Sequence, residues 1–229
     1  MRISIIEELT AAPIPPRSNI LVEFDADSQW YNTSFTLAAD WMKQGGTVSY
    51  NLLMRSPEKL RSTLEKHGLD VGELEENDKF RVQDYYTATL GKSSSEIHGW
   101  RSLKIHDMSV EFARVAFGSE PESGLLRIWD NMSVLGRFNE DKTWVEFMLS
   151  RGLPLGIGLG ATTLHGIVNG VHESWVYKRL EDAHDGIVDV RVGNDGKDLI
   201  RVRSMREVGF DRKWHELTIS PNLEVSLGK

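Results

Sequence analysis

The sequence predicts an α/β fold: a mostly parallel central sheet flanked by helices, with antiparallel strands at the C-terminal end. Short apolar runs suited to buried strands alternate with segments that carry apolar residues at helical spacing. Parallel strands need such helical crossovers, which then cover both faces of the sheet. An Asn194-Asp195-Gly196 turn among closely spaced β segments indicates antiparallel hairpins from about Asp189 onward.

The first elements follow from apolar spacing and capping residues. Ser56-Pro57-Glu58 has a capping Ser, Pro at the first helical position and an acid in the first turn, and Gly68 closes that helix. Gly45-Gly46 end the helix before it. We expect strands over Asn19–Phe24, Thr47–Leu53, Phe80–Tyr85 and Leu125–Trp129, and helices over Phe35–Gln44, Ser56–Gly68 and Leu103–Phe117.

The second half continues the pattern and then changes. Asn139 is expected to cap a helix that ends near Gly152, and a Gly-containing apolar strand is expected over Leu155–Leu164. The remaining predicted elements are a helix over Ser174–Ala183 and strands over Gly186–Val192, Leu199–Arg203, Glu216–Ser220 and Leu223–Leu227.

Length and composition fit one domain over residues 1–229, with residues 1–18 as a short lead-in. The chain is 40% hydrophobic and 27% charged, without a run of the ~20 apolar residues that span a membrane and without a signal-peptide pattern. With no cysteine, disulfides and thiol catalysis are excluded. We expect a cytoplasmic protein that binds neither membrane nor, with a net charge of −7, nucleic acid.

Four stretches carry a recognisable pattern, in order, over nearly the whole chain: Val48–Leu60, Leu125–Asn131, Val176–Arg191 and Arg201–Arg206. Together they resemble the KaiC-like branch of the RecA-type ATPases. They look like the family's second strand with its Ser-Pro-Glu helix start, its Walker B strand, its Lys-Leu-Glu helix before Asp-Gly and a strand, and the strand that ends in Lys-Met-Arg-Gly. The resemblance implies a RecA-like central sheet.

The positions that carry ATPase chemistry in that family hold other residues here. The expected loop Asp25–Thr36 lacks the glycines and the lysine of a phosphate cradle, and Thr33 and Ser34 lie nearest the family's Gly-Lys-Thr. Met54 and Arg55 replace two glutamates, one of which activates water in active members. Ser204 and Glu207 replace the Lys and Gly of Lys-Met-Arg-Gly, and what remains is Asp130, Met205 and Arg206.

The predicted degenerate nucleotide site would therefore repel a bound phosphate. Asp25 and Asp27, ~6 Å from a triphosphate, would each oppose a unit charge by roughly 3 kcal/mol at an effective dielectric constant of ~20. Asp25 and Asp27 form either a solvated turn or, together with Asp130, a cation site. If Asp130 has no ligand, we expect it to cap a nearby loop. Trp30 and Tyr31 either stack on a base or pack over the vacated cleft.

Other candidates are weaker. His165 and His172 lack the spacing of a metal pair, and His184-Asp185 lacks a nucleophile, so no metal site or catalytic residue is predicted. Arg201, Arg203, Met205 and Arg206 form either a solvated edge or a subunit interface, with nucleic-acid contact as a third reading.

These observations favour a catalytically inactive KaiC-like regulatory or scaffold protein without cofactor. It would bind a protein partner or itself, with a dimer favoured. One alternative is a nucleotide-binding ATPase with an atypical phosphate loop that uses ATP and magnesium. Another is a DNA-associated accessory protein related to recombinase paralogues, which the salt dependence of DNA binding would reveal.

Overall fold

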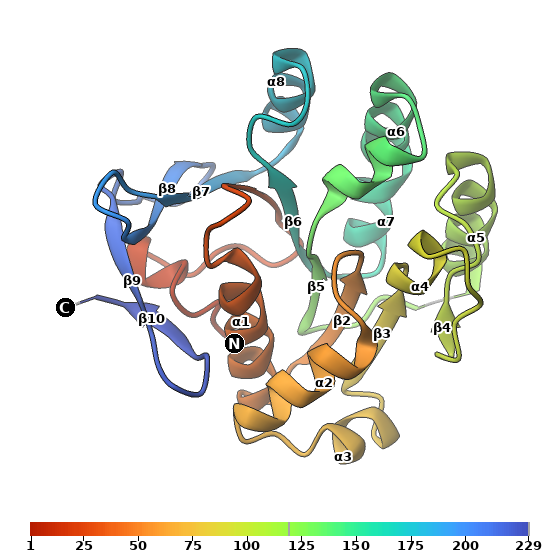
Figure 1. Cartoon of the computed structure of the whole chain (residues 1–229), viewed down its shortest axis with the longest axis horizontal. Coiled ribbons are helices and arrows are strands. Elements are labelled where there is room, and N and C mark those ends of the chain that lie inside the picture. The colour runs from red at the N-terminus through yellow and green to blue at the C-terminus, as the bar shows by residue number, and fades with distance from the viewer. Residues whose placement is uncertain (119, 229) are drawn as a thin grey trace.

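A computed structural model describes residues 1–118 and 120–228, and the side chains of all of these except 116–118. The described strands form one ten-stranded sheet in the order β10-β9-β8-β7-β1-β6-β5-β2-β3-β4 (Figure 1). The strands are β1 (Asn19–Phe24), β2 (Thr47–Leu52), β3 (Phe80–Asp84), β4 (His98–Gly99), β5 (Leu125–Trp129), β6 (Thr162–Val168), β7 (Gly186–Val192), β8 (Asp198–Met205), β9 (His215–Ile219) and β10 (Val225–Leu227).

The sheet has the predicted topology. All pairs from β7 through β1, β6, β5, β2 and β3 to β4 are parallel, whereas β7–β8, β8–β9 and β9–β10 are antiparallel. The antiparallel part therefore begins with β8, because β7 still runs parallel to β1. The Asn194-Asp195-Gly196 turn connects β7 to β8, as predicted.

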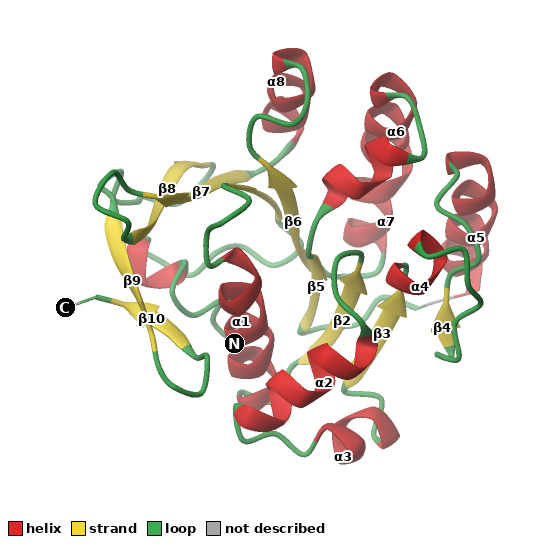
Figure 2. Ribbon diagram, in the orientation of Figure 1, coloured by secondary structure: helices red, strands yellow, loops and turns green. Residues whose placement is uncertain are grey.

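Helices lie on two sides of the strands (Figure 2). One face is covered by α1 (Trp30–Lys43), α2 (Pro57–Lys66) and α3 (Val71–Glu76). The other is covered by α5 (Ile105–Gly118), α6 (Asp141–Phe147), α7 (Leu153–Gly158) and α8 (Ser174–Ala183). Shorter helical segments are η1 (Glu7–Leu9), α4 (Tyr86–Thr89), the 3₁₀ segment η2 (Met132–Arg137) and the π-helical segment η3 (Met148–Gly152).

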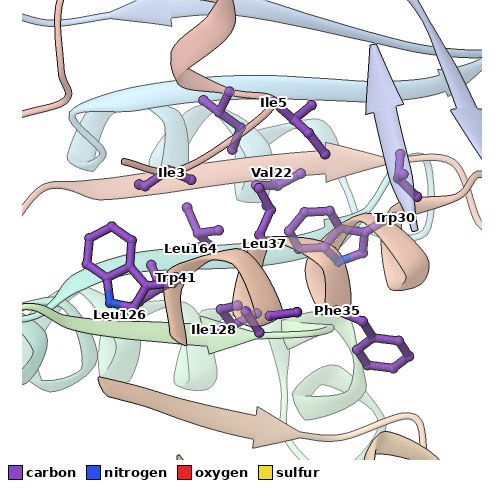
Figure 3. Packing of buried hydrophobic residues seen from close by; sticks show 14 of the residues in the cluster. Ile3, Ile5, Val22, Trp30, Phe35, Leu37, Trp41, Leu126, Ile128 and Leu164 are labelled. Atoms are coloured by element: carbon purple, nitrogen blue, oxygen red, sulfur yellow. The ribbon is translucent and has the colours of Figure 1, made fainter. Parts of the chain in front are cut away.

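The face under α1 buries a large apolar core (Figure 3). Val22 of β1, Ile128 of β5 and Leu164 of β6 point toward Leu37 of α1, and all four are 0–1% exposed. The N-terminal lead-in contributes to this core through Ile3, Ile5, Ile6 and Leu9, which are all buried. Residues 1–18 are thus packed against the sheet in addition to leading into β1.

Three local predictions are wrong. The helix expected from Phe35 begins at Trp30, so most of the expected loop Asp25–Thr36 is helical. Leu153–Gly158 is helical and the strand starts only at Thr162, because α6 continues through η3 and Pro154 suits an early helical position. Asn139 does not cap α6: its Oδ1 accepts a 3.0 Å hydrogen bond from the Ile105 N–H and thereby holds the start of α5.

In the described part of the chain, no helix is long and apolar enough to cross a membrane.

Candidate functional site

The candidate site is the edge of the sheet where β1, β2, β5 and β6 end. Open α/β sheets bind ligands outside the carboxyl ends of their parallel strands. Only Asp25–Gln29 lie between β1 and α1, so a phosphate cradle would have to form there. That segment is a tight turn, in which the N–H and hydroxyl of Ser28 both donate to the Asp25 carbonyl, at 3.0 and 2.7 Å.

Trp30 fills the space beside this turn. Its side chain is buried, with 1% exposure, and its Nε1–H donates a 2.7 Å hydrogen bond to the main-chain carbonyl of Asp130. Gly166 of β6 makes room for this contact, because a Cβ there would lie 2.7 Å from the indole nitrogen and 2.5 Å from the Asp130 carbonyl oxygen. Since Trp30 is buried, it presents no face on which a nucleotide base could stack.

Tyr31 and Arg55 close the same region from outside. The Tyr31 hydroxyl accepts a 3.2 Å hydrogen bond from Asn131 Nδ2, and the Arg55 guanidinium lies 4.8 Å from the Tyr31 ring centroid. Burial, with the negative charge of Asp130, raises the pKa of Tyr31 well above its usual range. The structure thus packs Trp30, Tyr31, Arg55 and Asp130 against one another, and together they fill the space beside the turn after β1.

Asp130 is fully buried and caps the loop after β2. Its Oδ1 accepts from the Leu53 N–H at 2.9 Å and its Oδ2 from the Met54 N–H at 3.2 Å. Burial raises the pKa of Asp130 to about 7, although these N–H groups, that of Asn131 and Arg55 favour the charged form. Both carboxylate oxygens are therefore engaged by the main chain.

Thr33 and Ser34 lie inside α1, where their hydroxyls bond to their own helix. Thr33 Oγ1 donates to the Gln29 carbonyl at 2.9 Å, and Ser34 Oγ bonds to the Tyr31 carbonyl at 2.8 Å and to Tyr50 Oη at 2.6 Å. Both residues are fully buried. These hydroxyls are not arranged on a loop around a phosphate or magnesium.

The two aspartates of the turn, Asp25 and Asp27, have different surroundings. Asp25 pairs with Arg191 Nη1 at 2.7 Å and accepts from the Val192 N–H at 3.2 Å. Although burial alone would raise the pKa of Asp25, these contacts and one from Asn169 hold it below its usual value. Asp27 is exposed. Within residues 1–118 and 120–228, no group of three or more His, Asp or Glu side chains is arranged to hold a metal ion.

Arg201 and Arg203 do not form a free basic edge, because both pair with acids on the sheet. Arg201 Nε donates to Asp189 at 2.7 Å, and Arg203 Nη2 donates to Glu23 at 2.5 Å and pairs with Glu181 of α8 at 2.9 Å. Burial and a hydrogen bond with Glu181 raise the pKa of Glu23 to about 7, against the opposing effect of Arg203.

The end of β8 holds the remaining residues of the predicted interface. Met205 is buried, and its sulfur would lie 2.6 Å from a Cβ at Gly186. Arg206 is exposed and donates to the Asp182 carbonyl at 2.8 Å. Glu207, where the resembled family has Gly, has a φ of +66°, in the left-handed region that glycine favours.

His165 and His184 are hydrogen-bonded to each other, whereas His172 bonds to Asp141. His184 accepts from His165 at 3.1 Å and donates Nδ1–H to the Leu180 carbonyl at 2.6 Å, so it forms no pair with Asp185. Burial lowers the pKa of His184 to about 4. His172 donates Nδ1–H to Asp141 at 3.0 Å, which leaves its buried Nε2 without a partner among the described residues.

Open space at this edge lies beside η2 and α6 instead of α1. A pocket of about 530 Å³ is lined by Met54, Asn131, Ser133, Arg137, Asp141 and His172. Sequence reasoning missed it because its residues come from three separate segments, those that follow β2, β5 and β6, without a shared motif. It also missed Glu23, Arg127 and Asp189, although a charged residue inside an apolar central strand is a readable signal.

No family model matches this sequence, and no curated protein matches it. Among solved structures, the chain is similar to a KaiC-like protein from the hyperthermophilic archaeon Pyrococcus horikoshii OT3, with a TM-score of 0.75 over 100% of this chain and 98% of that chain. The identity is 15%, so the likeness concerns the fold. The chain has a KaiC-like, RecA-type fold, as its sequence predicts.

Proposed function

We propose that this protein is a cytoplasmic regulatory or scaffold protein that keeps a KaiC-like fold without ATPase chemistry. Residues 1–229 act as one domain that binds a protein partner or a second copy of itself, and neither nucleic acid nor a cofactor. The observation that carries the proposal is Trp30, whose buried indole occupies the region next to the turn where a phosphate cradle would form.

The neighbouring residues support the same proposal. A phosphate needs main-chain N–H groups that converge on it, a lysine and a hydroxyl that holds magnesium. Here the hydroxyls of Thr33 and Ser34 bond within α1, and Asp130 bonds to the main chain of Leu53 and Met54. Met54 also cannot polarise a water molecule for hydrolysis.

Calorimetric titration with magnesium-ATP tests the loss of nucleotide binding. Wild type and Asp130→Asn are both expected to give flat traces at millimolar nucleotide, and a P-loop ATPase titrated in the same buffer is the positive control. A micromolar isotherm that Asp130→Asn abolishes would overturn the proposal in favour of an atypical ATPase.

Light scattering tests self-association. The β9–β10 hairpin forms one edge of the sheet, and Ile219 on β9 is 38% exposed and Trp214 beside it 39%. A dimer is the expected product because two-fold pairs are the commonest closed assembly. A dimer mass at tens of micromolar, unchanged by magnesium-ATP, supports this part of the proposal, whereas a monomer mass contradicts it and leaves a different protein as the partner.

A further inference from the structure

Arg127, in the middle of β5, is a buried cation without a counter-ion in the part of the chain that the structure describes. Its side chain is 5% exposed, and no described residue forms a hydrogen bond or ion pair with its guanidinium. A guanidinium removed from water is costly unless it is paired and hydrogen-bonded. The Trp129 ring, whose centroid lies 6.0 Å from the guanidinium carbon, supplies only a cation–π contact.

Further polar atoms without partners surround Arg127. Asn19, Thr163 and Arg127 lie in one register row across β1, β6 and β5. A Cβ at Gly156 of α7 would lie 2.8 Å from Thr163 Oγ1, 3.6 Å from Arg127 Nη1 and 3.7 Å from Asn19 Oδ1, so the three groups share one space. In the described chain, these atoms and Trp129 Nε1, His165 Nε2 and Tyr85 Oη are all buried without a hydrogen-bond partner.

A cavity of about 1150 Å³ opens beside this cluster, between the sheet and α5, and Arg127 lies in its wall. Ser49 and Gln83 lie in the same wall, as does Trp100, which stacks on Tyr85 with ring centroids 4.5 Å apart. The volume is large enough to enclose a metabolite-sized ligand. The cavity is lined in part by Arg81 and Leu125, near the starts of β3 and β5. It therefore lies away from the strand ends that form the candidate nucleotide site.

Two other arginines of the wall are paired with acids, whereas Arg101, which also lines the cavity, is exposed. Arg81 pairs with Asp78 at 2.7 Å and with Glu122 at 2.8 Å, and Arg114 pairs with Glu111 at 2.9 Å. Acidic Asp107 and Glu120 also line the cavity. General attraction of anions is therefore weak here, and recognition depends on direct pairing with Arg127.

We propose that this cavity binds a small-molecule oxyanion, a carboxylate or a phosphate, held by the guanidinium of Arg127. Arginine matches both groups because its planar fork donates two parallel hydrogen bonds to two oxygens. An oxyanion supplies the missing counter-ion, and the polar side chains of Ser49 and Gln83 in the cavity wall can bond to the rest of the ligand. Trp100, stacked on the buried Tyr85, offers a flat aromatic wall for an apolar part of that ligand.

Thermal unfolding and calorimetric titration with defined probes test this site. The probes are sodium phosphate, acetate and benzoate, each compared with sodium chloride at equal ionic strength. At least one probe is expected to raise the wild-type Tm saturably by about 2–4 °C. A response to phosphate alone identifies a phosphate ligand, and a response to acetate or benzoate identifies a carboxylate ligand.

Arg127→Met is expected to weaken the affinity for that probe at least tenfold. Arg114→Gln, at an arginine of the cavity wall that pairs with Glu111, should keep the wild-type affinity. In chloride, Arg127→Met should be no less stable than wild type, because it removes an uncompensated buried charge. If Arg127→Met does not fold, Arg127→Lys replaces it, and the loss of the fork should again weaken binding about tenfold. Absence of any oxyanion effect in wild type, or an equal effect in the Arg127 variant, would overturn the proposal.

Discussion

The two faces of the central sheet are built differently, although the same strands supply both. On the α1 side, Ile20 and Val22 of β1 are 0% exposed and pack among apolar neighbours. On the α8 side, Leu21 packs in a second apolar core, whereas Glu23 is 3% exposed and pairs with Arg203. Apolar packing is non-directional, whereas a buried charge needs a specific partner. Both sides therefore stabilise the fold through apolar cores, but the α8 side, called the polar face below, also buries charged strand residues that the α1 side, the apolar face, lacks at these positions.

The polar face is itself divided between satisfied and unsatisfied charges. Glu23 and Asp189 have arginine partners from β7 and β8, so their cost of burial is offset within the chain. Arg127, three strands away from β7, has no partner among the described residues. This contrast separates a structural ion-pair network from a site that a ligand completes.

The largest effect is expected on the apolar face. Trp30→Ala removes a fully buried indole and its hydrogen bond to Asp130, which should lower the free energy of unfolding by about 3–5 kcal/mol. Urea denaturation measures this loss. Trp214→Ala, at a tryptophan that is 39% exposed, is the matched control and should cost less than about 1 kcal/mol. Equal losses in the two variants would contradict the conclusion that Trp30 stabilises the fold as a buried core residue.

A smaller effect is expected in the ion-pair network. Arg203→Met leaves Glu23 and Asp189 short of a counter-charge and should cost about 2–3 kcal/mol. Adding Glu23→Gln should recover at least half of that loss, because the unpaired carboxylate is then gone. The exposed pair Arg179–Glu146 is the control, and Arg179→Met should change stability by no more than about 0.5 kcal/mol. Strict additivity of the Arg203 and Glu23 substitutions would refute their coupling.

The smallest effect is a pH dependence at Asp130, where the two faces meet at the end of β5. Its pKa rises from 3.8 to about 7 on folding, so the folded state binds the extra proton between these values. This stabilisation is complete below pH ~4 and is lost as the pH rises through 7. As the pH rises from 5 to 8, the free energy of unfolding of Asp130→Asn should therefore increase relative to that of wild type, by on the order of 1–2 kcal/mol.

Unfolding by urea at pH 5, 6, 7 and 8 checks this difference. His184, whose pKa falls from 6.5 to about 4, has the opposite sign, because its neutral folded form gains stability as the pH rises through this range. It is present in both proteins and cancels in the comparison. Parallel stability curves for wild type and Asp130→Asn would show that the Asp130 proton does not distinguish the folded state from the unfolded state.

Much of the fold could be predicted from local sequence. The limits of β1, β5, β7 and α8 agree with the predicted ones, and Ser56 caps α2 by accepting a 3.4 Å hydrogen bond from the Lys59 N–H. These features depend on apolar periodicity and on chemistry within one turn. The start of α1 was wrong because Trp30 and Tyr31 look like loop aromatics until their distant partners Asp130 and Asn131 are known.

The sequence by itself determined that this is an α/β protein with a parallel sheet, antiparallel C-terminal strands and no standard phosphate loop, because periodicity, turn residues and missing motifs are properties of the chain alone. Only the tertiary structure decided which buried charges are paired. Strand register places Glu23 beside Asp189 and Asp189 beside Arg201, but places Arg127 beside Thr163 and Ser49. Pairing depends on neighbours across strands that are far apart in sequence, and no local pattern records them.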